Sequence, residues 1–208
     1  AISPEMLSLA LSEDVKDSFN MISVDGDTST NDMVSVLSNG MAGNRPITGR
    51  GEDFDVFCKA LSLITKNLCR KIAADGEGAT RLIECRLAGA SDEQSARTAA
   101  RAVVSSSLVK AAMFGSDANW GRVLCAIGYS GIDTDPEKID VSFESANGRI
   151  EVCRNGSGVD FSEEIAKKIL TSDEVVIDVS LNAGNSCAVA WGCDLTYDYV
   201  KINGDYRT

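Results

Sequence analysis

A short segment, residues 75–80, carries the first side chain that could take part in chemistry. In it Gly76 and Gly78 flank Glu77. Glycines on both sides let the backbone approach a ligand closely, and they would hold the Glu77 carboxylate at the tip of a loop. The same residues also fit a helix end followed by an ordinary turn with a solvated acid. A phosphate-binding loop is excluded, because no Gly-Lys-Ser/Thr follows.

The end of the chain, residues 191–208, is the second such segment. It combines Trp191 and three tyrosines with the polar Asn203 and Thr208. Disordered termini are poor in aromatic residues, so we expect this segment to be packed against the rest of the protein. It is either a terminal helix that closes the core or a tail that carries Asn203 and Thr208 back to a pocket.

A third polar segment, residues 25–32, contains Asp25, Asp27 and Asp32. The spacing invites comparison with a calcium-binding loop, but it lacks the glycine and the distal glutamate of an EF-hand. Aspartate, glycine, serine and threonine readily form turns through side-chain hydrogen bonds to the backbone. We therefore interpret the segment as a hairpin turn and expect no metal site.

Composition excludes several kinds of function. The chain has 208 residues and no histidine, which excludes Ser-His-Asp and Cys-His catalysis and histidine-containing metal sites within it. Its net charge of −11 argues against nucleic acid or an anionic membrane surface as a partner. Seven cysteines without a CxxC pair, scattered through apolar segments, are typical of reduced thiols in a cytoplasmic protein.

The elements that must position these residues alternate between helix and strand, which predicts an α/β or α+β fold. Ser3 and Pro4 mark a helix start, residues 54–72 have the clearest helical spacing of apolar side chains, and Asn147–Gly148 is a strong hairpin signal. Residues 107–114 are ambiguous, and a soft boundary is expected near Gly78. Further helices are expected at 92–104, 120–127, 162–170 and the chain end, and strands at 21–24, 33–37, 82–87, 139–143, 149–153, 175–181 and 187–191.

Four segments together resemble the β chain of ornithine acetyltransferase, also called bifunctional glutamate N-acetyltransferase. They are residues 18–32, 75–80, 119–122 and 191–208, and they occur in the family's order over nearly the whole chain. In that family a precursor cleaves itself before a threonine, giving α and β chains that stay associated. The freed threonine is the β chain's first residue and the nucleophile. It takes acetyl from N-acetylornithine and passes it to glutamate, and bifunctional members also accept acetyl-CoA.

The resemblance implies that Glu77, Asn203 and Thr208 bind substrate. It places the oxyanion donors in the α chain and the nucleophilic threonine before Ala1, so we expect no catalytic residue within this sequence. No metal or organic cofactor is implied. An N-terminal threonine supplies its own base through its α-amino group, which suits a chain without histidine. Acetyl transfer would then be ping-pong through an acyl-enzyme, with Glu77 either holding a substrate ammonium or accepting the attacking amine's proton.

The family's fold is a two-layer αββα sandwich that both chains build. Residues 1–78 would belong to that sandwich, and residues 79–208 would form a smaller α/β region whose tail returns to the active site. The implied partners are the α chain, in an α2β2 or larger assembly, and small-molecule substrates of arginine biosynthesis. Three alternatives stay open: a paralogue with another acyl acceptor, a related self-cleaving N-terminal-nucleophile aminopeptidase, and a non-catalytic binding protein.

Overall fold

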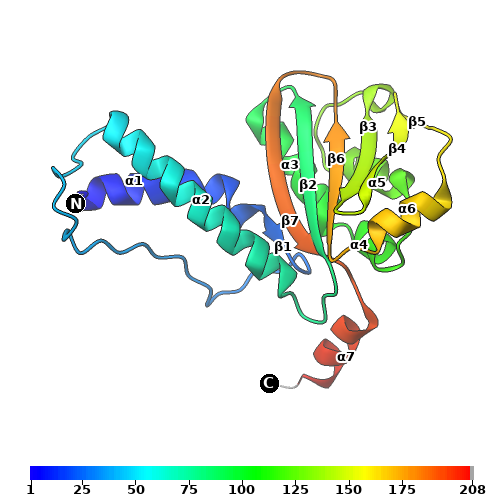
Figure 1. Cartoon of the computed structure of the whole chain (residues 1–208), viewed down its shortest axis with the longest axis horizontal. Coiled ribbons are helices and arrows are strands. Elements are labelled where there is room, and N and C mark those ends of the chain that lie inside the picture. The colour runs from blue at the N-terminus through cyan, green and yellow to red at the C-terminus, as the bar shows by residue number, and fades with distance from the viewer. Residues whose placement is uncertain (207–208) are drawn as a thin grey trace.

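The computed structural model describes residues 1–206 and contains one mixed sheet (Figure 1). The strand order is β1-β7-β2-β6-β3-β4-β5. β2 (Leu82–Ala90) lies inside the sheet, parallel to β6 (Glu174–Ser180) and antiparallel to β7 (Ser186–Cys193). The other strands are β1 (Ile22–Ser23), β3 (Asp140–Ser145), β4 (Gly148–Arg154) and β5 (Ser157–Gly158).

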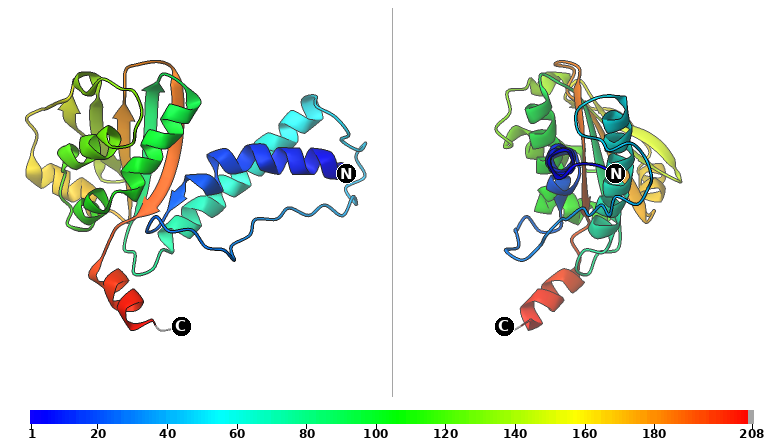
Figure 2. Two further views of the ribbon diagram at one scale, coloured as in Figure 1. Left: turned by 180° about the vertical axis from the view of Figure 1, so that it is seen from behind. Right: turned by 90° about the vertical axis from the view of Figure 1, so that its left-hand side faces the viewer.

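Helices cover both faces of the sheet (Figures 1 and 2). Alternate residues of a strand point to the same side, so Ile83, Cys85 and Leu87 of β2 share one face. All three are buried there, on the face that carries α3. Glu84 points to the opposite face, where Arg70 of α2 donates to its carboxylate. The helices within residues 1–206 are α1 (Pro4–Asp14), α2 (Glu52–Ala74), α3 (Glu93–Ser105), α4 (Ser107–Phe114), α5 (Trp120–Gly128), α6 (Glu163–Leu170) and α7 (Tyr197–Asp205), with short 3-10 turns η1 (Val15–Asp17), η2 (Phe19–Met21) and η3 (Pro136–Lys138).

This architecture confirms the predicted mixed α/β class and most of the predicted elements. The Ser3 hydroxyl accepts from the Met6 N–H, so α1 begins with the expected cap and proline. The ambiguous residues 107–114 form α4. The predicted hairpin joins β3 to β4, with Gly148 already paired to Ser145.

The predicted strand at 33–37 is wrong, and the segment before it is not a hairpin turn. Residues 24–46 form no helix or strand. Met33 is 84% exposed and Leu37 is 93% exposed. An apolar segment becomes a strand only where a neighbouring strand takes up its backbone hydrogen bonds, and the described chain offers none here. The predicted strand at 21–24 likewise shrinks to Ile22–Ser23.

The expected packing of the chain end holds for its first part and fails for the rest. Trp191 lies in β7 and is buried. Tyr197 and Tyr199 lie in the helix α7, none of whose residues is buried. Tyr197 is 82% exposed, and α7 extends away from the sheet (Figure 1). The helix is held instead by a few contacts at its first turn and along one side, described below.

Two separate hydrophobic clusters stabilise the chain. The larger one lies between the sheet and its helices, and the smaller one joins α1 to the start of α2 through Met6, Ala10 and Phe54. The smaller cluster lies within residues 1–78, whereas Cys69 and Ala73 of α2 belong to the larger one. No helix within residues 1–206 is both long and apolar enough to cross a membrane.

Candidate functional site

The loop that carries Glu77 runs from the end of α2 to the start of β2. Its two glycines are needed because the loop packs closely on residues 193–199. A Cβ on Gly76 would lie 2.6 Å from the Cys193 Sγ, and one on Gly78 would lie 2.7 Å from the Tyr199 amide nitrogen. Gly78 also has φ +68°, a backbone conformation that residues other than glycine rarely adopt. The glycines therefore let the loop backbone approach another segment of the same chain, whereas the sequence suggested a close approach to a ligand.

Glu77 and Asn203 meet at the surface, although they lie 126 residues apart in sequence. Asn203 Nδ2 donates to Glu77 Oε2 at 2.6 Å and also to the Tyr199 carbonyl at 3.1 Å. Both side chains are exposed. Within residues 1–206, no hydrogen bond uses Glu77 Oε1 or Asn203 Oδ1. Thr208, the third predicted site residue, lies outside the described residues.

Thr196 connects this pair to the body of the protein. Its hydroxyl donates to the Gly78 carbonyl at 2.7 Å and accepts from the Tyr199 N–H at 3.3 Å. One buried side chain thus holds the Glu77 loop and caps α7, the helix that carries Asn203. The loop that carries Glu77 and the helix that carries Asn203 are therefore both hydrogen-bonded to Thr196.

A buried amine lies beneath the same segment. Lys110 of α4 is 2% exposed, and its Nζ donates to the Cys193 carbonyl and contacts the Cys193 Sγ at 3.5 Å. Burial lowers the pKa of Lys110, because it disfavours the charged ammonium, and burial raises the pKa of the Cys193 thiol. Burial and a raised pKa both argue against Cys193 as a nucleophile, because the thiolate is the reactive form.

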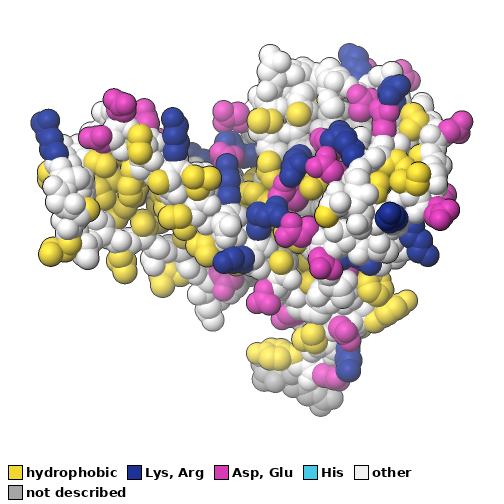
Figure 3. Space-filling view, in the orientation of Figure 1, with side chains coloured by type: hydrophobic (Ala, Val, Ile, Leu, Met, Phe, Trp, Pro, Cys, Tyr) yellow, Lys and Arg dark blue, Asp and Glu magenta, His cyan; other side chains and the backbone are white. Residues whose placement is uncertain are grey.

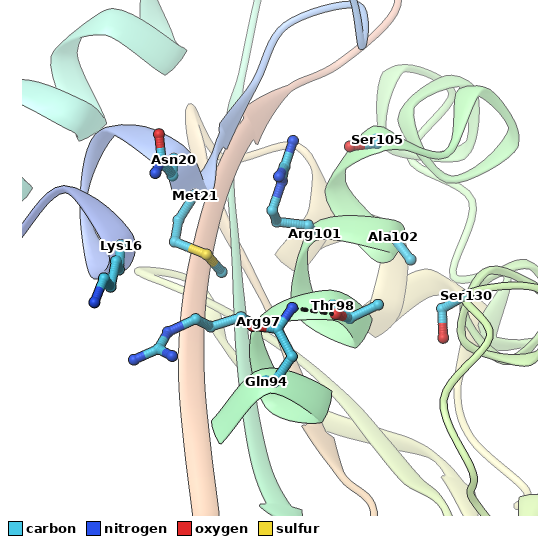
Figure 4. Close-up of a pocket in the computed structure, with 10 residues that line it drawn as sticks. All are labelled: Lys16, Asn20, Met21, Gln94, Arg97, Thr98, Arg101, Ala102, Ser105 and Ser130. Atoms are coloured by element: carbon cyan, nitrogen blue, oxygen red, sulfur yellow. Dashed lines mark hydrogen bonds between the residues drawn. The ribbon is translucent and has the colours of Figure 1, made fainter. Parts of the chain in front are cut away.

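One hollow of the surface lies away from the Glu77–Asn203 pair (Figure 4). It has a volume of about 430 Å³ between η1, η2 and α3, and no residue of the Glu77 loop or of α7 lines it. Arg97, one of its cations, is bound by Asp17 at 2.7 Å and Glu93 at 3.1 Å. The charged ends of Lys16 and Arg101 point in different directions (Figure 4). The cations that line this hollow therefore do not converge on one place where an anionic ligand would bind.

A sequence model of the ArgJ family matches residues 1–208. This chain belongs to the ArgJ family. It is 56% identical over 207 residues to arginine biosynthesis bifunctional protein ArgJ 1 of Clostridium acetobutylicum, which covers 100% of this chain and 51% of that relative. It is 54% identical over 202 residues to arginine biosynthesis bifunctional protein ArgJ of Caldanaerobacter subterraneus subsp. tengcongensis, covering 97% and 50%.

A solved structure agrees with this assignment. The crystal structure of arginine biosynthesis bifunctional protein ArgJ from Bacillus halodurans matches with a TM-score of 0.93 at 48% identity, covering 99% of this chain and 95% of that chain. The family match confirms the resemblance inferred from the sequence motifs. The present chain spans about half the length of the ArgJ relatives described above.

Two residues that hold the Glu77 loop and the segment before α7, Lys110 and Asp194, were not foreseen from the sequence. Lys110 had a signal, since it is the one charged residue of the apolar segment 108–113. Asp194 follows a strand and did not stand out, whereas Asp25 belongs to the polar segment 25–32, which was interpreted as a turn. Within residues 1–206, no group of three or more cysteine, aspartate or glutamate side chains is arranged to hold a metal ion.

Replacing Gly78 by alanine should displace α7. Gly78→Ala meets both the unfavourable φ and a Cβ contact with the first turn of α7. Gly40 is the matched control, because it has φ +69° with nothing within 4 Å of an added Cβ. We expect Gly40→Ala to cost about 1–2 kcal/mol from strain alone and Gly78→Ala about 1–3 kcal/mol more, measured by thermal unfolding. Equal losses would show that α7 does not pack on Gly78.

Tyr199 ties α7 to the residues after β1 in a pH-dependent way. Its hydroxyl donates to Asp25 Oδ2 at 3.1 Å. Burial, followed by the hydrogen bond and the charge of Asp25, raises the pKa of Tyr199. A raised folded-state pKa stabilises the fold fully below the unfolded pKa of about 10, and the gain is lost as the pH rises through the folded value.

Tyr199→Phe should therefore lower stability at neutral pH but not in strong alkali. The contact is partly exposed, so we expect a loss of about 0.5–1 kcal/mol, or roughly 1–4 °C in thermal midpoint. Thermal unfolding of both proteins at about pH 8 and about pH 11 measures the difference, which should be smaller at the higher pH. A difference that is the same at both pH values would contradict this assignment of the Tyr199 hydroxyl.

Proposed function

We propose that this chain is the β subunit of a cytoplasmic acetyltransferase of arginine biosynthesis, which moves acetyl from N-acetylornithine to glutamate. The observation that carries the proposal is the exposed Glu77–Asn203 pair, formed across 126 residues in a chain of the ArgJ family. The relatives' name, arginine biosynthesis bifunctional protein, agrees with this activity. Acetyl-CoA is the second donor to be tested.

The chemistry of the pair fits these substrates. A carboxylate at Glu77 matches an ammonium group, and the Asn203 amide can bind a substrate carboxylate or amide through either end. The nucleophile in this proposal is a threonine outside the present sequence. Its hydroxyl attacks the acetyl carbonyl of N-acetylornithine, ornithine leaves, and the glutamate amine then attacks the acetyl-threonine ester. That amine must lose a proton, which Glu77 could accept directly or through water. Thr208 is proposed as a third substrate contact.

An α chain from the same precursor is the proposed partner. The relatives are about twice as long as this chain, whereas the solved chain is about as long, which is what a protein made in two pieces would give. Figure 3 shows hydrophobic side chains gathered over α2 and its neighbours. In the proposal, residues 1–78 join the α chain in an αββα sandwich, residues 79–208 form the smaller region, and αβ pairs assemble as α2β2 or larger.

Acetyl-transfer assays on this chain combined with the other half test the proposal. We expect labelled acetyl to pass from N-acetylornithine to glutamate, with an acetylated threonine trapped by rapid acid quench and identified by mass spectrometry. Omitting glutamate should leave that acetyl-enzyme in place. Hydrolysis of short peptides without transfer would favour the aminopeptidase, and transfer only to another amine would favour a specialised paralogue. The absence of both activities would favour a non-catalytic binding protein.

A further inference from the structure

Asp194 occupies a buried position between the Glu77 loop and the core. It is 2% exposed, and no salt bridge within residues 1–206 includes it. Its carboxylate instead accepts three hydrogen bonds from two consecutive residues: the Thr80 N–H at 2.8 Å, the Thr80 hydroxyl, and the Arg81 N–H at 3.0 Å. A buried charge is tolerated only where donors replace its water, so these bonds fix the place of Thr80 and Arg81.

The segment that carries Asp194 is itself fixed to α4 on both sides. Lys110 Nζ donates to the carbonyl of Cys193, and the Leu195 N–H donates to the Lys110 carbonyl at 3.3 Å. The Asp194 N–H donates to the Arg81 carbonyl at 3.2 Å. Asp194 is therefore held by the core and in turn holds the residues that end the Glu77 loop.

The Arg81 side chain reaches the same helix. Its Nη1 donates to the carbonyls of Met113 and Phe114, the latter at 2.8 Å, at the C-terminal end of α4. The last part of the Glu77 loop is thus attached to α4 both directly and through Asp194. On the other side, Thr196 joins Gly78 to α7. Hydrogen bonds, together with the short backbone stretches between them, thus connect α4 to both members of the exposed pair.

We propose that Asp194 is a positioning residue for acetyl transfer: it sets the loop so that Glu77 faces Asn203 and the substrate. This inference rests on the proposed function. Misplacement of a substrate-binding group by about 1 Å can cost roughly 100-fold in rate, although the misplaced group itself is unchanged. Asp194 touches no substrate in this proposal, and its effect passes through Glu77.

Asp194→Ala in the complete two-part protein tests the proposal. It leaves three donors without an acceptor, and we expect kcat/KM to fall roughly 100-fold. Asp194→Asn should recover most of the activity, because its amide oxygen can still accept from both backbone N–H groups while its nitrogen donates to the Thr80 hydroxyl. In a Glu77→Gln background, Asp194→Ala should lower kcat/KM by less than about 3-fold, since the group it positions is already impaired.

Asp92→Ala is the matched control. Asp92 also accepts three hydrogen bonds, from the Ser95 N–H at 2.8 Å, the Ser95 hydroxyl at 2.7 Å and the Ser91 hydroxyl at 2.9 Å, but it caps α3. It should lower the thermal midpoint without changing kcat/KM. If Asp194→Ala fails to fold, Thr80→Val removes one donor and keeps both backbone bonds, and it should lower kcat/KM several-fold.

Hydrogen exchange gives a readout that does not require activity. Asp194→Ala, or Thr80→Val in its place, should speed amide exchange in peptides covering residues 75–81 and 196–206, whereas Asp92→Ala should not. Unchanged exchange there, or full additivity of Asp194→Ala with Glu77→Gln, would overturn the positioning role. Absence of transfer in the wild-type protein, with the exchange result as expected, would instead overturn the proposed function alone.

Discussion

Glu77→Gln should lower the kcat/KM of acetyl transfer by roughly 10–1,000-fold, the range between one lost ionic contact and one lost proton acceptor. The substitution keeps the side chain's length and an oxygen that can accept from Asn203 Nδ2. The Glu77 side chain is exposed, so stability should change by no more than about 0.5 kcal/mol. Only the charge is removed, and the kinetic loss measures what that charge does.

The two roles open to Glu77 give different kinetics. If the carboxylate holds a substrate ammonium, the KM for the amine substrate should rise, and kcat should change little. If it accepts the proton of the attacking amine, kcat should fall, and the acidic limb of the kcat profile should disappear. Steady-state kinetics between about pH 5 and about pH 9 distinguish them.

Asp75→Asn is the control, because it removes one negative charge from the same exposed loop. It should leave both constants near the wild-type values. Asn203→Ala, alone and combined with Glu77→Gln, should show losses that do not add, since the two side chains share a hydrogen bond at 2.6 Å. Wild-type kinetics in Glu77→Gln would show that residues 75–80 are an ordinary helix end and turn with no role in the reaction.

Local patterns were sufficient to predict the helices and most strands. The apolar spacing in residues 54–72 lies within α2 (Glu52–Ala74), and the capping residues at Ser3 and Pro4 begin α1. These features depend on neighbours three or four residues away, which a sequence displays directly. The strand predicted at 33–37 failed because a strand also needs a partner, and a short apolar segment cannot say whether one is present.

The candidate site shows the same limit. No spacing rule brings Glu77 to Asn203, and their meeting could be expected only from the family resemblance. Asp194 gave no signal, because its role depends on the backbone of Thr80 and Arg81, more than a hundred residues earlier. The aromatic residues near the chain end led us to expect packing, but aromatic content does not tell whether a helix packs on its own chain or stays exposed.

The second large effect that we expect is loss of association between the two halves, caused by substitutions on the exposed side of α2. Apolar residues recur every four positions along this helix and remain exposed: Ile64 by 61%, Leu68 by 44% and Ile72 by 47%, with Leu63 beside them at 75%. The adjoining side of α2, which carries Thr65, Cys69 and Ala73, is already buried against the chain. An apolar surface that extends beyond the buried side of a helix indicates a second contact, and a contiguous exposed patch marks an interface.

Ile64→Glu combined with Leu68→Glu should therefore abolish both association with the other half and acetyl transfer. Burying two unpaired carboxylates costs several kcal/mol each, enough to weaken binding by more than roughly 1,000-fold. Ile165→Glu on α6 is the matched control, since Ile165 is 54% exposed on a helix outside this surface. Co-purification of the two halves and the transfer rate should both be lost in the α2 variant and kept in the control. If the α2 variant still joins the other half and transfers acetyl, this face of α2 lies outside the interface between the halves.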